Sequence, residues 1–235
     1  MTCRRDGTIL ARVKTTLAIF LLTLTCVAAS LAQEESTNLP PEAHEMSVSL
    51  FNHKDFSGWT FVMRNNADPL KTWMVTNDVI KCTGAANGYI RTTQVYSNYF
   101  LTVEWRFVKV APKADNTGIL INIQSPDKVW PMCIQIQGKH DRMGDLFLMA
   151  GAESKEHKGK PANTPLPIMG NSVERPVGEW NKVEIISIHN KVSVFVNGRF
   201  LNETTECTVN SGYIGFQSEG ADFEIRTVAY CPLKY

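Results

Sequence analysis

Two glutamines and a histidine stand close together in the segment WPMCIQIQGKH, which runs from Trp130 to His140. Gln135 and Gln137 alternate with isoleucines, so both amides are expected on one face of a strand, with His140 just beyond its end. Amides donate and accept hydrogen bonds, and an imidazole exchanges protons near neutral pH. The segment predicts a site for a polar ligand with an acid/base candidate beside it, although a solvated loop histidine is the alternative.

Polar side chains also recur at every second position of two other segments. Glu104 and Arg106 do so in YFLTVEWRFV, and Asn122 and Gln124 do so in GILINIQ. If the three segments are neighbouring strands of one sheet, their polar pairs form a contiguous band of donors and acceptors, as sugar hydroxyls require. The alternative is an ordinary solvated face of an antiparallel sheet, on which Arg106 simply pairs with Glu104.

Several aromatic residues supply flat apolar surface of the kind that stacks on sugar rings, although a place in the core is the alternative for each. They are Trp59, Trp73, Tyr89, Tyr99, Trp130 and Trp180.

The elements that position these groups are predicted to be strands. Apolar residues alternate in one segment after another from Val48 onward, and no amphipathic helix of three turns is predicted. Two strands are expected to join near His189-Asn190, and Asn197-Gly198 is typical of a two-residue hairpin turn. This pattern predicts an all-β fold, an antiparallel β-sandwich, with the charged and proline-containing stretch 150–176 as a long loop over one rim.

The chain of 235 residues has a formal net charge of +1 and no lysine and arginine cluster with interleaved aromatic residues. A nucleic-acid partner is therefore not expected. Four basic residues precede an apolar run over 17–29, and small residues follow at positions 30 and 32. The run is shorter than the ~20 residues that span a bilayer, so a cleaved signal peptide (1–32) is favoured over an anchor.

The remaining chain divides into a flexible linker (33–46) and a folded domain (47–235), which we expect to be exported to the periplasm or the extracellular space without membrane contact. Export permits disulfides, but no cysteine spacing has the CxxC form, so a thiolate metal site is not expected. The domain contains four cysteines, which allow three pairings or remain free: Cys82, Cys133, Cys207 and Cys231.

Seven motifs follow one another in the order known from the 3-keto-disaccharide hydrolase domain family, which this chain resembles from about Val48 to Tyr235. They are LFNHKDFSGWT, GYIRTTQVYSNYFLTVEWRF, NTGILINIQ, VWPMCIQIQGKHDRMGDLFL, RPVGEWNKVEI, VNGRFLNET and GYIGFQSEGADFEIRTV. The resemblance implies a concanavalin A-like jelly-roll sandwich with a concave carbohydrate cleft. It also implies cleavage of 3-keto-glycosides, by hydrolysis or elimination, through loss of the C2 proton and then of the C1 substituent.

The resemblance also suggests roles for residues in these motifs. The middle strand of the family usually reads Glu-x-Gln, whereas this chain has Gln135-Ile136-Gln137. If that glutamate is the base or a ligand in active relatives, this protein is either inactive there or relies on Glu104, Glu219 or His140. The catalytic candidates are Glu104, His140 and Glu219. The substrate-binding candidates are Arg106, Asn116, Asn122, Gln124, Gln135, Gln137, Asp145 and Arg226. A divalent cation is compatible with such oxygen and histidine ligands, but no ligand spacing specifies one.

Two further functions remain open at this stage. A non-catalytic carbohydrate-binding module on the same sandwich is favoured by Gln135, because an amide cannot take up a proton. An adhesion or cell-surface interaction domain is supported by the fold class alone.

Overall fold

The structure is a computed structural model that describes residues 47–109 and 116–234. These residues all belong to one compact unit. The predicted signal peptide (1–32) and linker (33–46) lie outside the described residues. Among the described residues, no helix is long and apolar enough to cross a bilayer.

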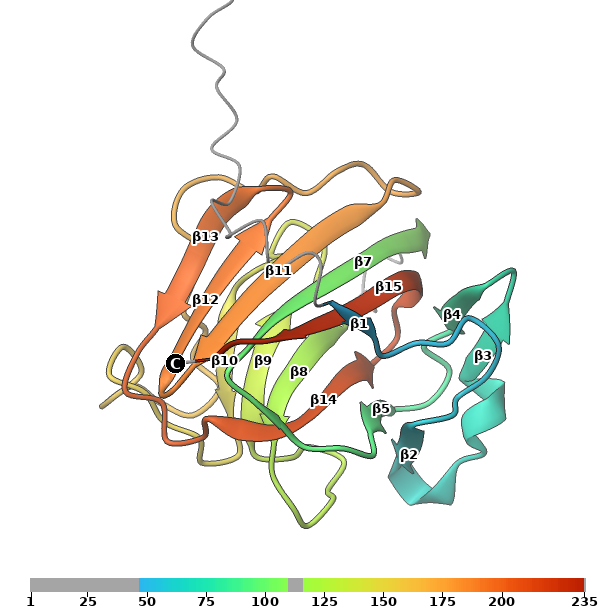
Figure 1. Cartoon of the computed structure of the whole chain (residues 1–235), viewed down its shortest axis with the longest axis horizontal. Helices are drawn as coiled ribbons and strands as arrows, with labels where there is room; N and C mark the ends of the chain where they lie inside the picture. Colours follow the sequence, from blue (N-terminus) through green and yellow to red (C-terminus); the bar gives the residue numbers. More distant parts are fainter. Residues whose placement is uncertain (1–46, 110–115, 235) are drawn as a thin grey trace, which may run out of the picture. The chain divides into compact units, whose positions relative to one another are not determined.

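The first of two antiparallel sheets contains eight strands (Figure 1). In the order of hydrogen-bonded neighbours they are β13 (Arg199–Thr204), β12 (Lys191–Val196), β11 (Asn181–Ile188), β7 (Tyr99–Lys109), β15 (Asp222–Pro232), β4 (Val79–Cys82) and β3 (Trp73–Thr76), with β1 (Val48–Ser49) on β15. The long central pair β7 and β15 therefore holds the middle of this sheet.

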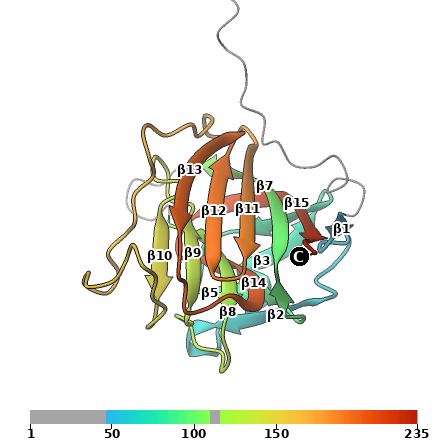
Figure 2. The ribbon, with the colours of Figure 1, turned by 60° about the vertical axis from the view of Figure 1, so that its left-hand side comes forward.

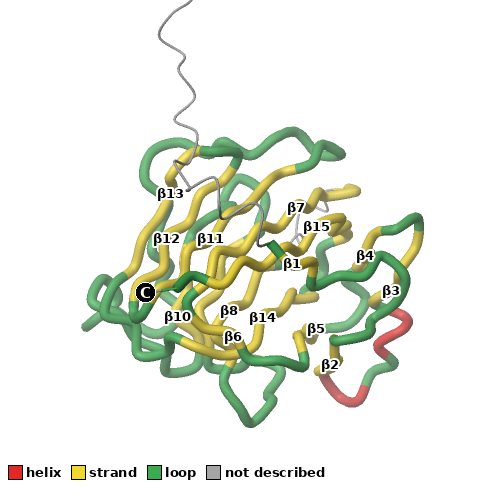
Figure 3. The backbone as a smooth tube through the Cα atoms, in the orientation of Figure 1, coloured by secondary structure: helices red, strands yellow, loops and turns green. Residues whose placement is uncertain are grey.

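The second sheet contains seven strands and packs against the first as a separate layer (Figure 2). Its order is β10 (Leu146–Met149), β9 (Cys133–Gln137), β8 (Gly118–Ile123), β14 (Ser211–Ser218), β5 (Gly88–Thr92) and β2 (Trp59–Met63), with β6 (Tyr96–Ser97) on β14. Two short 3-10 turns, η1 (Arg64–Asn66) and η2 (Pro69–Lys71), are the helical segments in the described chain, and Figure 3 shows strands and loops elsewhere. The predicted all-β antiparallel sandwich is confirmed.

The core lies between the inward faces of the two sheets, because alternate residues of each strand point to opposite sides. On β7, Tyr99, Leu101, Val103, Trp105 and Phe107 are all buried in this core, as the alternation predicted. The inward residues of β9 and β10 belong to the same core: Ile134, Ile136, Leu146 and Leu148.

Two tight turns also follow the sequence pattern. The β11–β12 hairpin pairs Ile188 with Lys191 and so turns through His189-Asn190. In the β12–β13 turn, Asn197 and Gly198 have φ values of 50° and 82°, the positive values that this kind of two-residue turn requires.

The prediction that the polar residues of three strands form one contiguous band is wrong in one respect. Strand β7, which carries Glu104 and Arg106, pairs with β11 and β15 in the first sheet, whereas β8 and β9 belong to the second. The long β7 finds its hydrogen-bond partners in segments far along the chain, and no local pattern indicates that choice. Glu104 and Arg106 therefore lie in a different sheet from Gln135 and Gln137.

The predicted outward orientation of Asn122 is also wrong. Asn122 has a φ of 54°, and the pairing of β8 with β14 shifts register at this point. The irregular residue reverses the alternation, so that the fully buried Asn122 side chain contacts Tyr99 and Ser187 of the opposite sheet. Gln124 instead donates to the carbonyl oxygens of Asn122 and Ser211.

The four cysteines of the described chain are free and buried. The stretch between β10 and β11 is a long loop, as expected, and Leu166 pairs with Leu146 of the edge strand β10. This places part of the loop along the β10 edge of the second sheet.

Candidate functional site

A groove lies on the outward face of the second sheet, where the polar residues of β9 and β14 point. It consists of two adjoining hollows of about 540 Å³ and about 770 Å³. Both hollows are lined by Asn116, Gln137, Phe147 and Glu219, so these residues mark their junction. Together the hollows are large enough for a ligand of two sugar rings.

The glutamines in this groove are buried and bonded to one another. The relative exposures of Gln135, Gln137 and Gln217 are 4%, 7% and 3%. Gln135 Nε2 donates to Gln137 Oε1 at 3.2 Å and to Gln217 Oε1 at 3.1 Å. Gln217 Nε2 then donates to Glu219 Oε2 at 2.9 Å. The glutamines are therefore not solvated surface but a connected row, named here the amide relay: Gln137, Gln135, Gln217 and Glu219.

The direction of the amide relay follows from two backbone groups. Gly138 N and Lys139 N both donate to the same side-chain atom of Gln137, so that atom must be the oxygen. The Gln135 atom beside it must then be the nitrogen, and the Gln217 atom facing that nitrogen must be an oxygen. Each amide thus fixes the next, and the relay ends with a donor aimed at Glu219.

Gly118 makes the relay possible. Strand β8 lies between β9 and β14, so Gln135 reaches Gln217 only by passing over β8. A Cβ atom at Gly118 would lie 2.7 Å from Gln135 Nε2 and 2.8 Å from Gln135 Cγ. The absence of a side chain at this position leaves the space that the Gln135 amide occupies.

We expect Gly118→Ala to disturb the relay without changing any of its members. The added methyl group has to displace Gln135, which should cost about 1–3 kcal/mol of stability and lower any activity of the groove roughly 10-fold. Chemical denaturation and a ligand or turnover assay measure the two effects. The control is to make Gly118→Ala in a protein that already carries Gln135→Ala. If Gly118→Ala destabilises this protein as much as the wild type, the contact with Gln135 is not the cause of the destabilisation.

Glu219 is the carboxylate at the junction of the two hollows. It follows β14 directly, and its Oε2 accepts hydrogen bonds from Asn116 Nδ2 at 2.5 Å and Gln217 Nε2 at 2.9 Å. Backbone bridges join Asn116 to Glu219 and Gly220. Its Oε1 accepts no hydrogen bond from the described residues. A carboxylate held by one oxygen in this way keeps its second oxygen for a ligand.

The larger hollow is polar. It is lined by two cationic side chains, Lys139 and Arg142, together with Asn87 and Asp145. Asp145 is buried, accepts a hydrogen bond from Ile168 N at 2.8 Å and lies 2.9 Å from Arg142 Nε. Asp145 thereby anchors Arg142 at this end of the groove.

The Glu104 carboxylate lies on the first sheet and does not line the groove. Its two oxygens accept hydrogen bonds from Arg226 and Thr227, and the Arg226 bonds hold the pKa of Glu104 below its usual range. Arg106 is paired with Glu224. The guanidinium carbons of Arg106 and Arg226 lie 4.4 and 4.6 Å from the ring centroid of Trp180, so each of these cations has both a carboxylate partner and the indole on this face.

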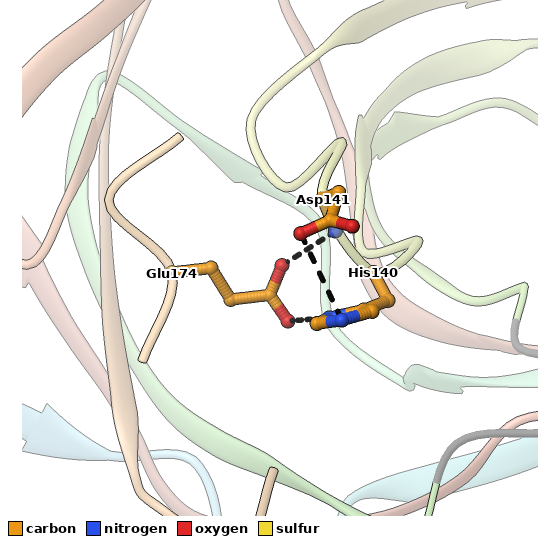
Figure 4. Close-up of side chains that lie close together, drawn as sticks. All are labelled: His140, Asp141 and Glu174. Carbon is orange, nitrogen blue, oxygen red and sulfur yellow. Dashed lines mark hydrogen bonds and ion pairs between the residues drawn. The ribbon is translucent and has the colours of Figure 1, made fainter. Parts of the chain in front are cut away.

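His140 lies next to the groove in sequence but does not line it. Its Nδ1 is 2.9 Å from Glu174 Oε1, and Glu174 Oε2 accepts from Asp141 N, as Figure 4 shows. Burial raises the pKa of Glu174. Among the described residues, His140, Asp141 and Glu174 form the group whose ligand atoms lie close enough to share an ion, within 4.8 Å of one another. Hydrogen bonds within the group already occupy both Glu174 oxygens.

The groove therefore unites five of the predicted site residues and separates the others from them. It brings together Asn116, Gln135, Gln137, Asp145 and Glu219. Sequence analysis missed Gln217, although the alternation in GYIGFQS places it outward beside Glu219. It also missed Lys139, Arg142, Phe147, Met149 and Asn163, and loop residues such as Asn163 follow no periodic pattern.

Comparison with protein families gives one match over most of the chain. The sequence profile of the 3-keto-alpha-glucoside-1,2-lyase-like domain matches residues 46–229. Among curated proteins no sequence matches.

Solved structures of similar fold include the following three proteins. A protein of Parabacteroides distasonis ATCC 8503, provisionally described as a glycosyl hydrolase, aligns with a TM-score of 0.61 at 22% identity, covering 85% of this chain and all of that one. A carbohydrate-binding module of Bacillus subtilis aligns with a TM-score of 0.54 at 11% identity, covering 74% and 95%. The exoplasmic domain of VIP36 aligns with a TM-score of 0.55 at 13% identity, covering 81% and 93%. At these identities the likeness shows the fold alone.

Proposed function

Because the chain belongs to the 3-keto-alpha-glucoside-1,2-lyase-like domain family, we propose that it cleaves glycosides whose C3 hydroxyl has been oxidised to a ketone. Family membership supports a function on carbohydrates. The specific chemistry, elimination or hydrolysis of a 3-keto-glycoside, is a further part of the proposal and rests on the groove and on Glu219.

The proposed reaction begins at C2 of the oxidised sugar. The C3 ketone acidifies the C2 proton, because the electrons of the C2–H bond move onto the C3 oxygen when the proton leaves. When the C3 carbonyl forms again, this electron pair makes a C1–C2 double bond and the C1–oxygen bond breaks. The glycosidic oxygen keeps the bonding pair and takes a proton, which leaves an alcohol and an unsaturated 3-keto sugar. Addition of water across the double bond completes net hydrolysis.

Glu219 is the proposed general base for the C2 proton. The observation that carries this assignment is its place at the junction of both hollows, with Oε2 bonded to Asn116 and Gln217. A base between two hollows can act on the middle of a bound ligand. The NH₂ group of Gln137 and the cations Lys139 and Arg142 supply donors and positive charge for the enolate oxygen.

The other residues of the groove are proposed to bind and orient the sugar. Gln135 holds Gln137 and Gln217 in the orientation described above, and Asn116 holds Glu219. Glu104, Arg106 and Arg226 lie in the other sheet, so they have no part in the proposed reaction. Export to the periplasm or extracellular space stays part of the proposal and rests on the N-terminal sequence.

The test is to incubate the protein with 3-keto-glucosides of both anomers and to follow release of the alcohol. We expect turnover, with the unsaturated 3-keto sugar or its hydrate identified by mass spectrometry. The unoxidised glucosides are the matched control and should not react, because their C2 proton is not acidic. Equal cleavage of oxidised and unoxidised glucosides would contradict the proposed chemistry.

A non-catalytic carbohydrate-binding module is the second candidate. The neutral amide at Gln135, where the resembled family pattern has a glutamate, favours it. Calorimetric binding of sugars without release of any alcohol would decide for the module.

A further inference from the structure

The two ends of the groove differ in chemistry. On one side of the junction, the walls are the apolar side chains Trp130, Met149 and Ala150 and the neutral amides Gln135, Asn163 and Gln217. On the other side, the walls carry Lys139 and Arg142. A ligand that spans both hollows therefore meets apolar side chains and neutral amides at one end and cationic side chains at the other.

The order of the carbon atoms in a sugar ring indicates which part of the substrate each hollow would bind in the proposed reaction. C2 lies between C1 and C3, so the C1 substituent and the C3 oxygen point away from C2 in different directions. If Glu219 acts at C2, one hollow receives the C3 oxygen and the other receives the leaving group. A developing enolate is stabilised by positive charge, which Lys139 and Arg142 offer and the described residues that line the other hollow do not. The leaving group then lies in the other hollow, which Trp130 lines.

Trp130 is suited to bind a ring there. Its relative exposure is 37%, although an indole of this size is usually covered in a folded domain. The C–H face of a sugar ring or the face of an aryl group packs well against such a flat apolar surface.

The loop that carries Trp130 is anchored on both sides of this residue. Asp127 accepts two hydrogen bonds from Arg91, at 2.8 and 2.7 Å, and a longer one from the Tyr89 hydroxyl. The Arg91 guanidinium in turn lies 3.9 Å from the centroid of the Tyr213 ring. At the base of the loop, Gln124 N donates to the Met132 carbonyl oxygen at 2.9 Å. These anchors hold the loop around Trp130 in place before a ligand binds, which lowers the entropic cost of binding.

We propose that Trp130 forms a leaving-group subsite, which favours 3-keto-glycosides whose C1 substituent has a flat apolar face over those whose C1 substituent is a small alkyl group. This inference rests on the proposed function for its orientation, because it takes Glu219 as the base at C2.

The experiment compares Trp130→Ala with Met132→Ala. Met132 is the matched control: it lies in the same loop with the same exposure of 37% but lines neither hollow. Each variant is assayed with a methyl and a phenyl 3-keto-glucoside. Trp130→Ala should raise KM for the phenyl substrate about 10-fold and change KM for the methyl substrate less than about 2-fold. Met132→Ala should leave both unchanged.

Two results would overturn the subsite. The first is an equal effect of Trp130→Ala on both substrates, and the second is an equal effect of the two variants on the phenyl substrate. Thermal denaturation of both variants shows whether either change comes from unfolding.

A binding experiment separates this inference from the proposed function. Phenyl and methyl glucosides, unoxidised and of both anomers, are titrated calorimetrically into the wild-type protein and the two variants. If Trp130→Ala loses affinity for phenyl glucoside but not for methyl glucoside, the subsite is supported. This result holds even if the wild type cleaves no 3-keto-glucoside, an outcome that would contradict only the proposed cleavage. If the wild type binds phenyl and methyl glucosides equally, the subsite is wrong whatever the turnover.

Discussion

Replacing Glu219 by glutamine is expected to lower kcat on a 3-keto-glucoside by about 10³-fold, within the range for loss of a general base. An amide cannot take up the C2 proton. The replacement has nearly the same shape, and its oxygen can still accept the hydrogen bonds of Asn116 and Gln217. The loss should therefore appear in kcat, with KM and the thermal unfolding midpoint little changed.

The matching variant Glu104→Gln tests the other carboxylate that sequence analysis singled out. Its charge lies on the first sheet beside Arg226, so we expect turnover within about 2-fold of the wild type. Steady-state kinetics of both variants decide between the two carboxylates. A large loss in Glu104→Gln with normal activity in Glu219→Gln would remove the basis for placing the reaction in the groove.

Replacing Gln135 by glutamate is expected to lower turnover by about 10- to 100-fold, although it restores the resembled family pattern. In this chain Gln135 Nε2 donates to Gln137 Oε1 and to Gln217 Oε1. A carboxylate would place oxygen against both of these oxygens. Rotation of the Gln217 amide would relieve one contact, but it would turn the Gln217 oxygen toward Glu219 Oε2.

The stability of this variant should also fall, by about 1–3 kcal/mol, because buried acceptors lose their donor. Protonation of the new carboxyl group would restore a donor, so the loss should shrink at low pH. Gln135→Leu separates the two effects, since it removes the donor without adding a charge. Higher turnover in Gln135→Glu than in the wild type would show that the relay is not the working arrangement and that this chain is a degenerate relative.

The amide relay explains how a groove with glutamine at this position can still present one carboxylate at its junction. The relay is neutral up to its last member, and the NH₂ groups of Gln135 and Gln217 donate within it to Gln137, Gln217 and Glu219. The result is a buried row of amides from β9 and β14 whose last amide, Gln217, donates a hydrogen bond to Glu219. A connected row of this kind is rigid, which suits the binding of a polar ligand.

Several features followed from the sequence alone. The alternation in YFLTVEWRFV predicts a strand whose apolar face is buried, and β7 is that strand. Asn197-Gly198 predicts the β12–β13 turn, because few other dipeptides adopt positive φ twice in succession. The order of seven motifs indicates the family, whose profile matches the chain. These are local properties, set by side-chain period and backbone preference.

The tertiary structure decided the rest. The alternation of apolar and polar residues predicts that Glu104 and Gln135 face outward from their strands. It does not predict that β7 and β9 belong to different sheets, because the partners of a strand are set by contacts between distant segments. One positive φ at Asn122 reversed the side chain that alternation placed outward. The hydrogen bond from Gln135 to Gln217 needs the space above Gly118, and the sequence shows no link between these three positions. The sequence thus determined the strands and the family. The folded sheets decided which polar groups lie next to one another, because two side chains share a face of a sheet only where strand order and register bring them together.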